Sequence, residues 1–571
     1  MDAAKEYSIW LQKVTDPQLL AELHHIEGDE NAIKSRFGAE LSFGTAGMRG
    51  VLEVGTNRMN VYTVRRATQG LADYINDVFG KGSVAVSYDS RNHSKEFAEE
   101  TAKVLAANGV KVYLYDRLMP VPMLSFAVRE LKCTAGVMIT ASHNPAEYNG
   151  YKVYGSDGCQ MTDDDADAVL RRINNHEYFD SIRTTELEAA LESGLVEYIS
   201  PRVVEAFYEQ ILKQRVNPAA PEKKGISIVY TPLNGAGNEP VRRVLSLCGH
   251  NNVTIVPEQE LPDGDFPTCP YPNPEMAEAR ALGLALCEQV KPDIFIATDP
   301  DADRVGVAFP DKDGSFRSLT GNEAGILMLD YIVRSHVENG TMPKDAVAVR
   351  SIVSSALADE IAAEAGVEMR VVLTGFKYIG EQILLLEQAG EEERFIFGFE
   401  ESCGYLSGGY VRDKDGVFAA MLLCELTSYY LNKKTTPLEV LEGIYKKYGY
   451  YRHRVANIAF PGLEGGDQMK AVTARLRETP PTELAGFAVV ERDDLKTLQH
   501  LDKDGNVTPI KLPVSDVLCY TLENGARVIV RPSGTEPKMK IYISAKESTP
   551  EASDALAEKL EAATRAAAGI A

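Results

Sequence analysis

Long hydrophobic runs, paired cysteines and a surplus of positive charge are all missing from this 571-residue sequence. Because no run of about 18 apolar residues occurs, we expect no membrane span. The start, Met1-Asp-Ala-Ala-Lys5, lacks the basic region and apolar core of a signal peptide. The eight cysteines include no Cys-x-x-Cys pair, which argues against a zinc site or a disulfide framework. We therefore expect a cytoplasmic protein with reduced thiols.

Charge and phosphate motifs exclude further classes of protein. The net charge of −23 argues against nucleic acid or an anionic membrane surface as a partner. Any phosphate site must then be locally basic against this acidic background. The sequence also lacks a Gly-x-x-x-x-Gly-Lys-Ser/Thr stretch, so an ATP cradle of that type is missing. A phosphate group used in catalysis must therefore come from the protein or the substrate.

A repeated pattern of strands and helices organises most of the chain. Each of three units holds a first, a second and a third apolar strand separated by helical segments, and the third strand ends in a polar loop. These endings lie at 137–142, 294–299 and 395–400. Strands that alternate with helices predict parallel sheets. Three such units predict three related domains around a shared cleft.

Both ends of the chain depart from this repeat. Residues 1–40 have helical spacing and predict a helical arm, whereas two apolar runs around Asn524-Gly525 predict a β-hairpin. A strand at 540–544 and an alanine-rich helix at 552–568 follow the hairpin. The predicted fold class is α/β, with four domains around a central cleft. Three are related mixed or parallel α/β domains and the fourth is a C-terminal antiparallel α+β domain. The predicted boundaries are 1–208, 209–320, 321–440 and 441–571.

The stretch Thr140-Ala-Ser-His-Asn-Pro145 follows a buried apolar run and carries a candidate nucleophile. Ser142 is expected at the carboxyl end of a strand, where open α/β sheets bind ligands. A serine hydroxyl needs a base, a metal or a prior modification to react. Neighbours on a strand point to opposite faces, so we do not assume a catalytic pair of Ser142 and His143. Lys152 can return to the same pocket as an acid or base. The alternative is a polar turn after a core strand.

A second motif, Asp299-Pro-Asp-Ala-Asp-Arg304, places three carboxylates at alternate positions. In an extended segment these project to one side, where they repel one another unless a cation lies between them. Hard oxygen ligands favour Mg²⁺ or Ca²⁺ over zinc. An EF-hand is excluded, because Arg304 and Pro310 stand where such a loop needs glycine and glutamate. The alternative is a solvated acidic turn.

Three further polar motifs are weaker signals when each is taken alone. Arg49, in the glycine-rich stretch 43–50, can bind an anion. Glu400 and Ser402, two residues apart on a strand, can accept from and donate to vicinal sugar hydroxyls. The stretch 531–535, Arg-Pro-Ser-Gly-Thr, combines an arginine, two hydroxyls and an exposed backbone into an anion nest. Each could instead be a structural turn.

Together these motifs resemble those of the α-D-phosphohexomutase superfamily over roughly residues 40 to 545, and the Phe43-Gly-Thr-Ala-Gly-Met-Arg-Gly50 opening is most similar to its phosphoglucomutase and phosphopentomutase branch. The resemblance implies that Ser142 carries a phosphate in the resting enzyme. It implies a Mg²⁺ site at Asp299, Asp301 and Asp303, to which the phosphoryl group on Ser142 adds an oxygen. The candidate catalytic residues beside Ser142 are Lys152, His143, Arg49 and Arg304.

The same resemblance implies two substrate sites. The sugar would be recognised by Thr374, Gly375, Lys377, Glu400 and Ser402. The phosphate that does not react would be held by Arg531, Ser533, Gly534 and Thr535, with Lys540 as an additional candidate.

The activity implied by the resemblance is the interconversion of glucose 1-phosphate and glucose 6-phosphate. Glucose 1,6-bisphosphate would be both the intermediate and an activator. The same mechanism on ribose or mannose phosphates is the alternative. The expected partner is a small sugar phosphate, and the expected assembly is a monomer or homodimer.

Two rival classes of function differ from a mutase. A metal-dependent phosphatase would use Asp299 as nucleophile and Asp301 as acid, but it requires threonine or valine where Asp303 stands, and it leaves the Ser142 loop unexplained. A sugar-phosphate binding module would not need a nucleophile and a metal site together.

Overall fold

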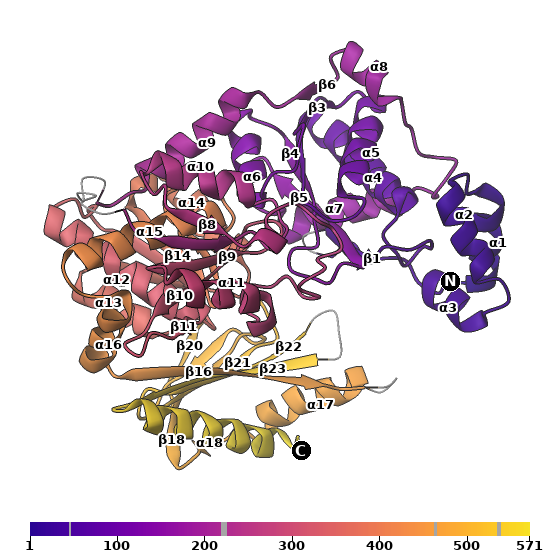
Figure 1. Ribbon diagram of the computed structural model, residues 1–571. Helices are drawn as coiled ribbons and strands as arrows, with labels where there is room; N and C mark the ends of the chain where they lie inside the picture. Colours follow the sequence, from indigo (N-terminus) through magenta and orange to yellow (C-terminus); the bar gives the residue numbers. More distant parts are fainter. Residues whose placement is uncertain (45–46, 218–224, 462–464, 534–537, 571) are drawn as a thin grey trace.

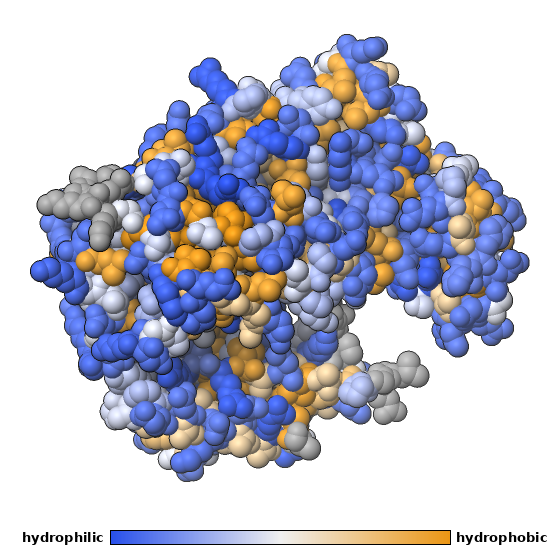
Figure 2. Space-filling view, in the orientation of Figure 1, coloured by the Kyte–Doolittle hydropathy of each residue, from blue (hydrophilic) through white to orange (hydrophobic). Residues whose placement is uncertain are grey.

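The computed structural model describes residues 1–44, 47–217, 225–461, 465–533 and 538–570. Strands of the described residues form four sheets. In Figure 1 the N-terminal helices lie at one side of the first sheet, and the C-terminal sheet lies below the other three. Figure 2 shows the surface notched between the N-terminal part of the molecule and the C-terminal part.

The N-terminal arm consists of three short helices, α1 (Ala3–Lys13), α2 (Pro17–His25) and α3 (Glu30–Phe37). Each begins at an aspartate whose side chain accepts from the backbone of the first turn, an arrangement that satisfies otherwise unpaired N–H groups. The fully buried Trp10 packs edge-on against Phe37. The predicted helical arm is confirmed.

The first sheet has six strands in the order β1-β5-β4-β2-β3-β6. In that order they are β1 (Gly47–Val51), β5 (Tyr148–Gly155), β4 (Ala135–Ile139), β2 (Ser83–Tyr88), β3 (Lys111–Leu114) and β6 (Val196–Tyr198). β4, β2, β3 and β6 are parallel, and β1 and β5 form an antiparallel edge. The helices of this part are α4 (Val61–Phe79), α5 (Ser94–Ala107), α6 (Val121–Glu130), α7 (Asp163–Ile173), α8 (Leu187–Glu192) and α9 (Pro201–Lys213). β4 is buried along its whole length, as expected of a strand covered on both faces.

The second and third sheets repeat the central part of this topology. The second runs β11 (Phe316–Ser318), β10 (Val305–Pro310), β9 (Ile294–Thr298), β7 (Ile228–Thr231), β8 (Val253–Ile255). The third runs β15 (Gly404–Leu406), β14 (Phe395–Glu400), β12 (Val347–Ser351), β13 (Glu368–Val372). In all three sheets an antiparallel strand borders the unit's third strand, and the third strand pairs in parallel with the first. The predicted repeat of three related α/β domains is confirmed.

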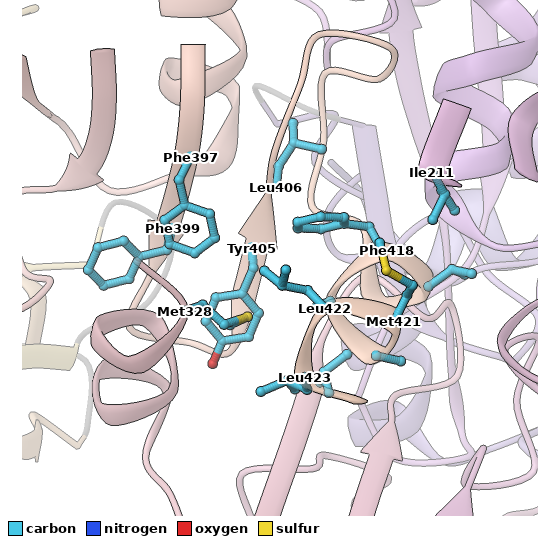
Figure 3. Close-up of a cluster of buried hydrophobic side chains, with 14 of the residues drawn as sticks. Ile211, Met328, Phe397, Phe399, Tyr405, Leu406, Phe418, Met421, Leu422 and Leu423 are labelled. Atoms are coloured by element: carbon cyan, nitrogen blue, oxygen red, sulfur yellow. The ribbon is translucent and has the colours of Figure 1, made fainter. Parts of the chain in front are cut away.

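Helices cover these two sheets and join them. They are α10 (Asn238–Leu247), α11 (Ala277–Val290), α12 (Gly321–Asn339), α13 (Leu357–Glu364), α14 (Phe376–Gln388), α15 (Gly416–Asn432) and α16 (Pro437–Tyr448). α15 is buried over nearly its whole length. Figure 3 shows its residues Phe418 and Leu422 on the side of Leu406 and Tyr405 of β15, and Met421 on the side of Ile211 of α9. One continuous core of buried residues runs from Ala85 to Tyr451, and it holds the first three sheets together.

The C-terminal part is antiparallel and has its own core. Its strands follow the order β16 (Tyr450–Ala459), β23 (Lys538–Glu547), β22 (Arg527–Pro532), β21 (Leu518–Leu522), β18 (Phe487–Asp494), β19 (Gln499–Leu501), β20 (Val507–Pro509), and β17 (Glu483–Leu484) pairs with β18. The helices α17 (Gly465–Glu478) and α18 (Pro550–Ala568) lie on this sheet (Figure 1). Gly525 has a φ of +83° in the turn between β21 and β22. The predicted hairpin and α+β class are confirmed.

Two sequence-based exclusions can be compared with the structure. Among the described residues, no helix combines the length and apolar character that crossing a membrane requires. All eight cysteines are buried, and none forms a disulfide. The predicted boundaries after residues 208, 320 and 440 stay a prediction.

Candidate active site

The polar loops after β4, β9 and β14 come together, although they lie far apart in the sequence. Ser142 Oγ donates to Asp299 Oδ2 over 3.0 Å, and the two residues are 157 positions apart. Thr140 and Asp301, from the same two loops, are also in contact, with Oγ1 and Oδ2 separated by 3.2 Å. The carboxyl ends of β4 and β9 thus form one site, as expected for open α/β sheets. The loop after β14 adjoins it, because its Cys403 carbonyl accepts from the Val305 backbone N–H over 3.0 Å.

Ser142 is held in an unusual backbone conformation. Its φ is +53°, in the left-handed region that non-glycine residues rarely adopt. The Thr140 hydroxyl accepts from the Ser142 backbone N–H over 2.8 Å. The residue is 4% exposed, so the hydroxyl lies at the floor of the site.

The expectation that Ser142 and His143 point apart is wrong. Ser142 Oγ and His143 Nδ1 are 3.1 Å apart. β4 ends at Ile139, so the alternation of side chains along a strand no longer applies at these two residues. Burial, followed by the positive charges of Arg304 and Arg49, lowers the pKa of His143 to about 2. The imidazole that touches the serine hydroxyl is therefore neutral.

Asp299, Asp301 and Asp303 form a buried cluster with the composition of a cation site. One carboxylate oxygen from each lies within 4.8 Å of the others. Within the described parts of the chain, Oδ1 of Asp301 and Oδ1 of Asp303 have no hydrogen-bond partner. Buried carboxylate oxygens without partners are costly, and a hard divalent cation would satisfy them. Burial, followed by repulsion from the other two carboxylates, raises the pKa of Asp299 well above its ordinary value.

Two lysines, the half-buried Lys152 and the buried Lys414, flank this cluster. Lys152 Nζ lies 2.9 Å from Asp301 Oδ2 and 3.8 Å from Asp303 Oδ2. Lys414 Nζ lies 3.2 Å from Asp303 Oδ2 and 2.9 Å from Asp413 Oδ1. Burial alone would lower the pKa of Lys152, but Asp301 and Asp303 outweigh it and raise that pKa. Lys152 thus lies beside the aspartates, and its role as an acid or base stays a prediction. Lys414 was not singled out from the sequence.

Two arginines lie near the cluster, Arg49 on strand β1 and Arg304 in the loop after β9. Arg49 on β1 is exposed and donates to Asn144 Oδ1 over 3.2 Å. Arg304 Nη1 lies 2.9 Å from Glu275 Oε1, a carboxylate that the sequence analysis did not single out. The Arg304 Nε lies 3.8 Å from Asp303 Oδ1. The site therefore combines a group of anions with a surrounding group of cations.

The two predicted sugar loops are joined by a hydrogen bond. Glu400 Oε1, at the end of β14, accepts from the Gly375 backbone N–H over 2.6 Å. Thr374 and Ser402 are half-buried, and Ser402 lies in the turn after β14 and not on the strand as expected. Lys377 instead pairs with Asp163 of α7, with 2.7 Å between Nζ and Oδ1. The structure therefore brings four of these residues together and places the Lys377 ammonium in a contact with the first α/β part.

The predicted phosphate loop follows β22 in the C-terminal sheet. Arg531 on β22 pairs in register with Lys540 on β23, so both side chains lie on one face. Ser533 follows β22 directly. Gly534 and Thr535 lie outside the described residues.

The sequence contained signals for the residues that were not singled out. Lys414 belongs to Arg412-Asp-Lys-Asp415, four charged residues that are all buried. Asp89 and Arg91 follow β2, the first strand of its unit, at the same edge as the Ser142 loop. Glu275 precedes α11 in the loop that reaches Arg304. In each case charged residues stand next to an apolar element.

Comparison with known families accounts for the four sheets. Four regions match the four domains described as "Phosphoglucomutase/phosphomannomutase", namely alpha/beta/alpha domain I at 40–179, domain II at 205–314, domain III at 320–448 and the C-terminal domain at 481–562. The chain belongs to the phosphoglucomutase/phosphomannomutase family. The resemblance drawn from the sequence motifs is confirmed. We use domains I to IV for these four parts below.

Relatives within this family are similar over almost their whole length. A phosphoglucomutase of Staphylococcus haemolyticus is 37% identical over 510 residues, which cover 89% of this chain and 91% of the relative. A phosphoglucomutase of Staphylococcus aureus (strain USA300) is 35% identical over 551 residues, 95% of this chain and 96% of the relative.

Solved structures support the fold. The Paramecium protein pp63/parafusin, a phosphoglucomutase in an open form, superposes with a TM-score of 0.69 at 17% identity over 93% of this chain and 96% of that one. A phosphoglucomutase/phosphomannomutase family protein of Burkholderia thailandensis gives 0.66 at 18% identity over 92% and 97%.

Proposed function

We propose that this protein is an isomerase that interconverts glucose 1-phosphate and glucose 6-phosphate through a phosphoserine at Ser142. The observation that carries the proposal is the contact between Ser142 Oγ and Asp299 Oδ2. It joins a candidate nucleophile to a cluster of three aspartates that fits a metal ion. The relatives named phosphoglucomutase, at 35% and 37% identity, support glucose phosphates as the substrates.

The proposed metal ion is Mg²⁺, with Asp299, Asp301 and Asp303 as its protein ligands. Their donors are all carboxylate oxygens, which suit a hard cation, and two of these oxygens have no hydrogen-bond partner among the described residues. When bound, Mg²⁺ would offset part of the charge of about −1.5 to −2 that a phosphoserine brings. The flanking Lys152 and Lys414 add further positive charge at the same place.

The reaction proceeds in two phosphoryl transfers. In the first, a P–O bond forms to the free sugar hydroxyl as the P–Oγ bond of phospho-Ser142 breaks, the hydroxyl proton leaves to a base, and Ser142 Oγ takes up a proton. In the second, a P–O bond forms between Ser142 Oγ and the other phosphate of glucose 1,6-bisphosphate as the P–O bond to the sugar breaks, the serine proton leaves, and the departing sugar oxygen takes up a proton. Lys152 is the proposed acid or base because its ammonium lies in the same pocket. Positioning and charge neutralisation supply most of the catalysis in such transfers.

The remaining site residues are proposed to act on the charge of the transferring phosphoryl group and on the Ser142 hydroxyl. Arg49 donates to Asn144 in the Ser142 loop, and Arg304 lies beside Asp303. Both are proposed to neutralise the transferring group. The neutral His143 contacts the Ser142 hydroxyl directly. It is proposed to orient the hydroxyl.

Two sets of residues bind the substrate in this proposal. Thr374, Gly375, Glu400 and Ser402, together with Lys377, recognise sugar hydroxyls. Arg531, Ser533, Gly534, Thr535 and Lys540 of domain IV hold the phosphate that does not react. The bisphosphate must reorient between the two transfers. We therefore propose that domain IV opens to release this grip, as lids do in other enzymes.

Product analysis separates this proposal from its rivals. The protein is incubated with Mg²⁺ and glucose 1-phosphate that contains a trace of glucose 1,6-bisphosphate, and the products are separated. Glucose 6-phosphate supports the mutase, free phosphate the phosphatase, and the absence of product a binding module. Parallel reactions with ribose 1-phosphate and mannose 1-phosphate test pentose and mannose specificity. Faster turnover of either substrate would overturn the assignment to glucose.

A further inference from the structure

The Arg91 side chain lies beneath the Ser142 loop and is bonded to its backbone. Its guanidinium donates to four carbonyl oxygens of this loop, those of Ser142, Asn144, Pro145 and Tyr148. The distances to the Pro145 and Tyr148 oxygens are 2.8 and 3.0 Å. The Arg91 side chain is 0% exposed. One fully buried cation thus binds both ends of a seven-residue segment.

This arrangement bears directly on the geometry of the nucleophile. Ser142 has a φ of +53°, and strained backbone of this kind persists only where the surrounding structure over-determines it. The Arg91 bond to the Ser142 carbonyl fixes the peptide that follows the strained residue. A planar guanidinium presents its donors in a rigid fork, so it can fix several carbonyls at once. Asp89 Oδ2, 3.4 Å from the Arg91 Nε, balances the charge.

The other side of the guanidinium is covered by domain II. The Arg91 Cζ lies 5.0 Å from the centre of the Phe266 ring, and Phe266 is 2% exposed. Beside it, Asn92 Nδ2 donates to Asp265 Oδ1 over 2.7 Å. A Cβ atom at Gly264 would lie 2.4 Å from the Asn92 backbone nitrogen. The segment 264–266 therefore sits directly against the end of β2 in domain I.

This segment is fixed to the domain that carries the aspartates. The backbone N–H of Asp263 donates to the Asn234 carbonyl in the loop after β7, and β7 pairs in parallel with β9, which leads into Asp299. The position of Phe266 over Arg91 and the position of Asp299 beside Ser142 consequently depend on the same contact between domains I and II.

We propose that Arg91 is a positioning residue for phosphoryl transfer, and that Phe266 of domain II helps to hold its guanidinium in place by packing against it. Ser142 then holds its reactive backbone geometry only while domain II, which brings the aspartate cluster, is seated on domain I. This inference rests on the proposed function, because it concerns the transfer of phosphate to and from Ser142. Arg91 touches no reacting atom and acts through the loop.

The first test compares Arg91→Lys with the matched control Arg66→Lys. Arg66 is also a buried arginine of domain I that donates to a backbone carbonyl, that of His176, over 2.8 Å, and its Cζ lies 4.5 Å from the ring of Tyr178. Its polar partners are Glu40, His176 and Tyr178, and none of them belongs to the Ser142 loop. Lysine keeps the positive charge but lacks the rigid, planar array of N–H donors that the guanidinium has. The two variants therefore lose similar packing, and only one loses the bonds to the Ser142 loop.

The second test changes Phe266, which packs over the guanidinium, and leaves Arg91 intact. Phe266→Leu keeps an apolar side chain but removes the aromatic face, whereas Phe266→Tyr keeps the ring. Phe309→Leu is the matched control, since Phe309 is fully buried in domain II and packs in the shared core. If Arg91→Lys does not fold, the Phe266 variants decide the question alone.

The measurements are kcat, KM for glucose 1-phosphate, the melting temperature, and the rate at which glucose 1,6-bisphosphate phosphorylates Ser142, followed by intact mass. In that half-reaction a P–O bond forms to Ser142 Oγ, the P–O bond to the sugar breaks, and the serine proton passes to the sugar oxygen. We expect Arg91→Lys to lower kcat and the phosphorylation rate by about 100-fold, as misplacement of a reacting group by about 1 Å does. KM should stay within about threefold of the value for the Arg66→Lys control.

We expect Phe266→Leu to lower kcat and the phosphorylation rate about tenfold through loss of the cation–π contact. Phe266→Tyr should keep both rates close to those of wild type. The proposal would be overturned if the rates fell in proportion to the melting temperature, and to the same extent in the variants and in their controls. Arg91 would then be a purely structural residue. Failure of the proposed function is distinguishable, because wild-type protein would then form no glucose 6-phosphate and no phosphoserine.

Discussion

Lys152 Nζ lies 2.9 Å from Asp301 Oδ2, inside the cluster that fits a divalent cation. Lys414 holds the neighbouring Asp303 from another side. The negative charge of the aspartates is therefore already shared between two lysines. A metal ion that binds here must share these carboxylates with the lysines, so metal binding and the position of Lys152 are coupled.

Asp301→Asn tests this coupling. The change turns an anionic ligand neutral and removes the partner of Lys152, so we expect kcat to fall and the Mg²⁺ concentration for half-maximal activity to rise on the order of tenfold or more. Asp313→Asn, on an exposed turn of the same domain, should change neither. Equal activity of wild type in Mg²⁺ and in excess chelator would show that the cluster is not a catalytic metal site.

Ser142→Ala removes one hydroxyl from the floor of the site. The fold should be retained, and turnover should fall by about 10⁴-fold or more, as for other enzymes that lose a nucleophile. Intact mass of purified wild type should reveal a fraction with one phosphate that the variant lacks. The control Ser246→Ala, on the exposed surface of α10, should match wild type in both measurements. Turnover by Ser142→Ala close to that of wild type would refute the assignment.

Arg531→Ala weakens the proposed grip on the phosphate that does not react. If this grip is equally strong in the ground state and the transition state, KM should rise more than kcat falls. Steady-state kinetics in both directions should reveal the change, because the same loop holds a different phosphate in each half-reaction. Arg475→Ala, on the exposed side of α17, is the control. Unchanged KM in both directions would remove Arg531 from the phosphate site.

Glucose 1,6-bisphosphate should activate enzyme that has lost its phosphate. The sequence has no ATP cradle of the Gly-x-x-x-x-Gly-Lys-Ser/Thr type, so in our proposal only a bisphosphate sugar can restore phospho-Ser142. Enzyme stripped of phosphate should therefore show a lag or no activity on glucose 1-phosphate alone, and a trace of the bisphosphate should abolish the lag. Immediate full rate without the bisphosphate would contradict the phosphoserine mechanism.

His453 on β16 makes stability depend on pH. Burial, followed by the charges of Arg350 and Arg452, lowers its pKa to about 4, below the value of about 6.5 in an unfolded chain. Between these values the unfolded chain binds the proton and the folded protein does not, so acid favours unfolding. This contribution to stability is complete above about pH 6.5 and decreases as the pH falls toward 4.

The measurement is the melting temperature of wild type and His453→Gln at pH 7.5 and pH 5. The variant should lose less stability than wild type over this interval. His25→Gln, exposed on α2, should behave as wild type does. An equal loss in His453→Gln would show that this histidine is not the group responsible.

Much of the fold could be predicted because its signals are local. Apolar runs such as those that became β4, β9 and β14 end in polar loops, and the Asn524-Gly525 pair marks its hairpin. The contact between Ser142 and His143 could not be predicted, because it depends on a left-handed residue beyond the end of the strand. Contacts between domains are equally invisible in local pattern.

Lys377 shows that a sequence motif can also assign a side chain to a site when its partner in the structure lies elsewhere. The motif places it in a sugar loop, but its ammonium pairs with Asp163, which is 214 residues away in the chain. Arg91 and Lys414 were missed for the same reason. Their roles follow from which carbonyls and carboxylates surround them in space, and a charged residue in isolation looks like part of the surface.

The separation of Ser142 from Asp299 also has a consequence in time. The two residues are 157 positions apart, so at ~5–20 residues per second a ribosome needs roughly 8 to 30 seconds to travel from one to the other. Throughout that interval the growing chain presents its serine loop without the aspartates beside it. Chains stalled before residue 299 should therefore fail to take up phosphate, although their first α/β sheet has been synthesised. The reactive serine is made early and becomes an active nucleophile only after more than half of the 571 residues have been joined.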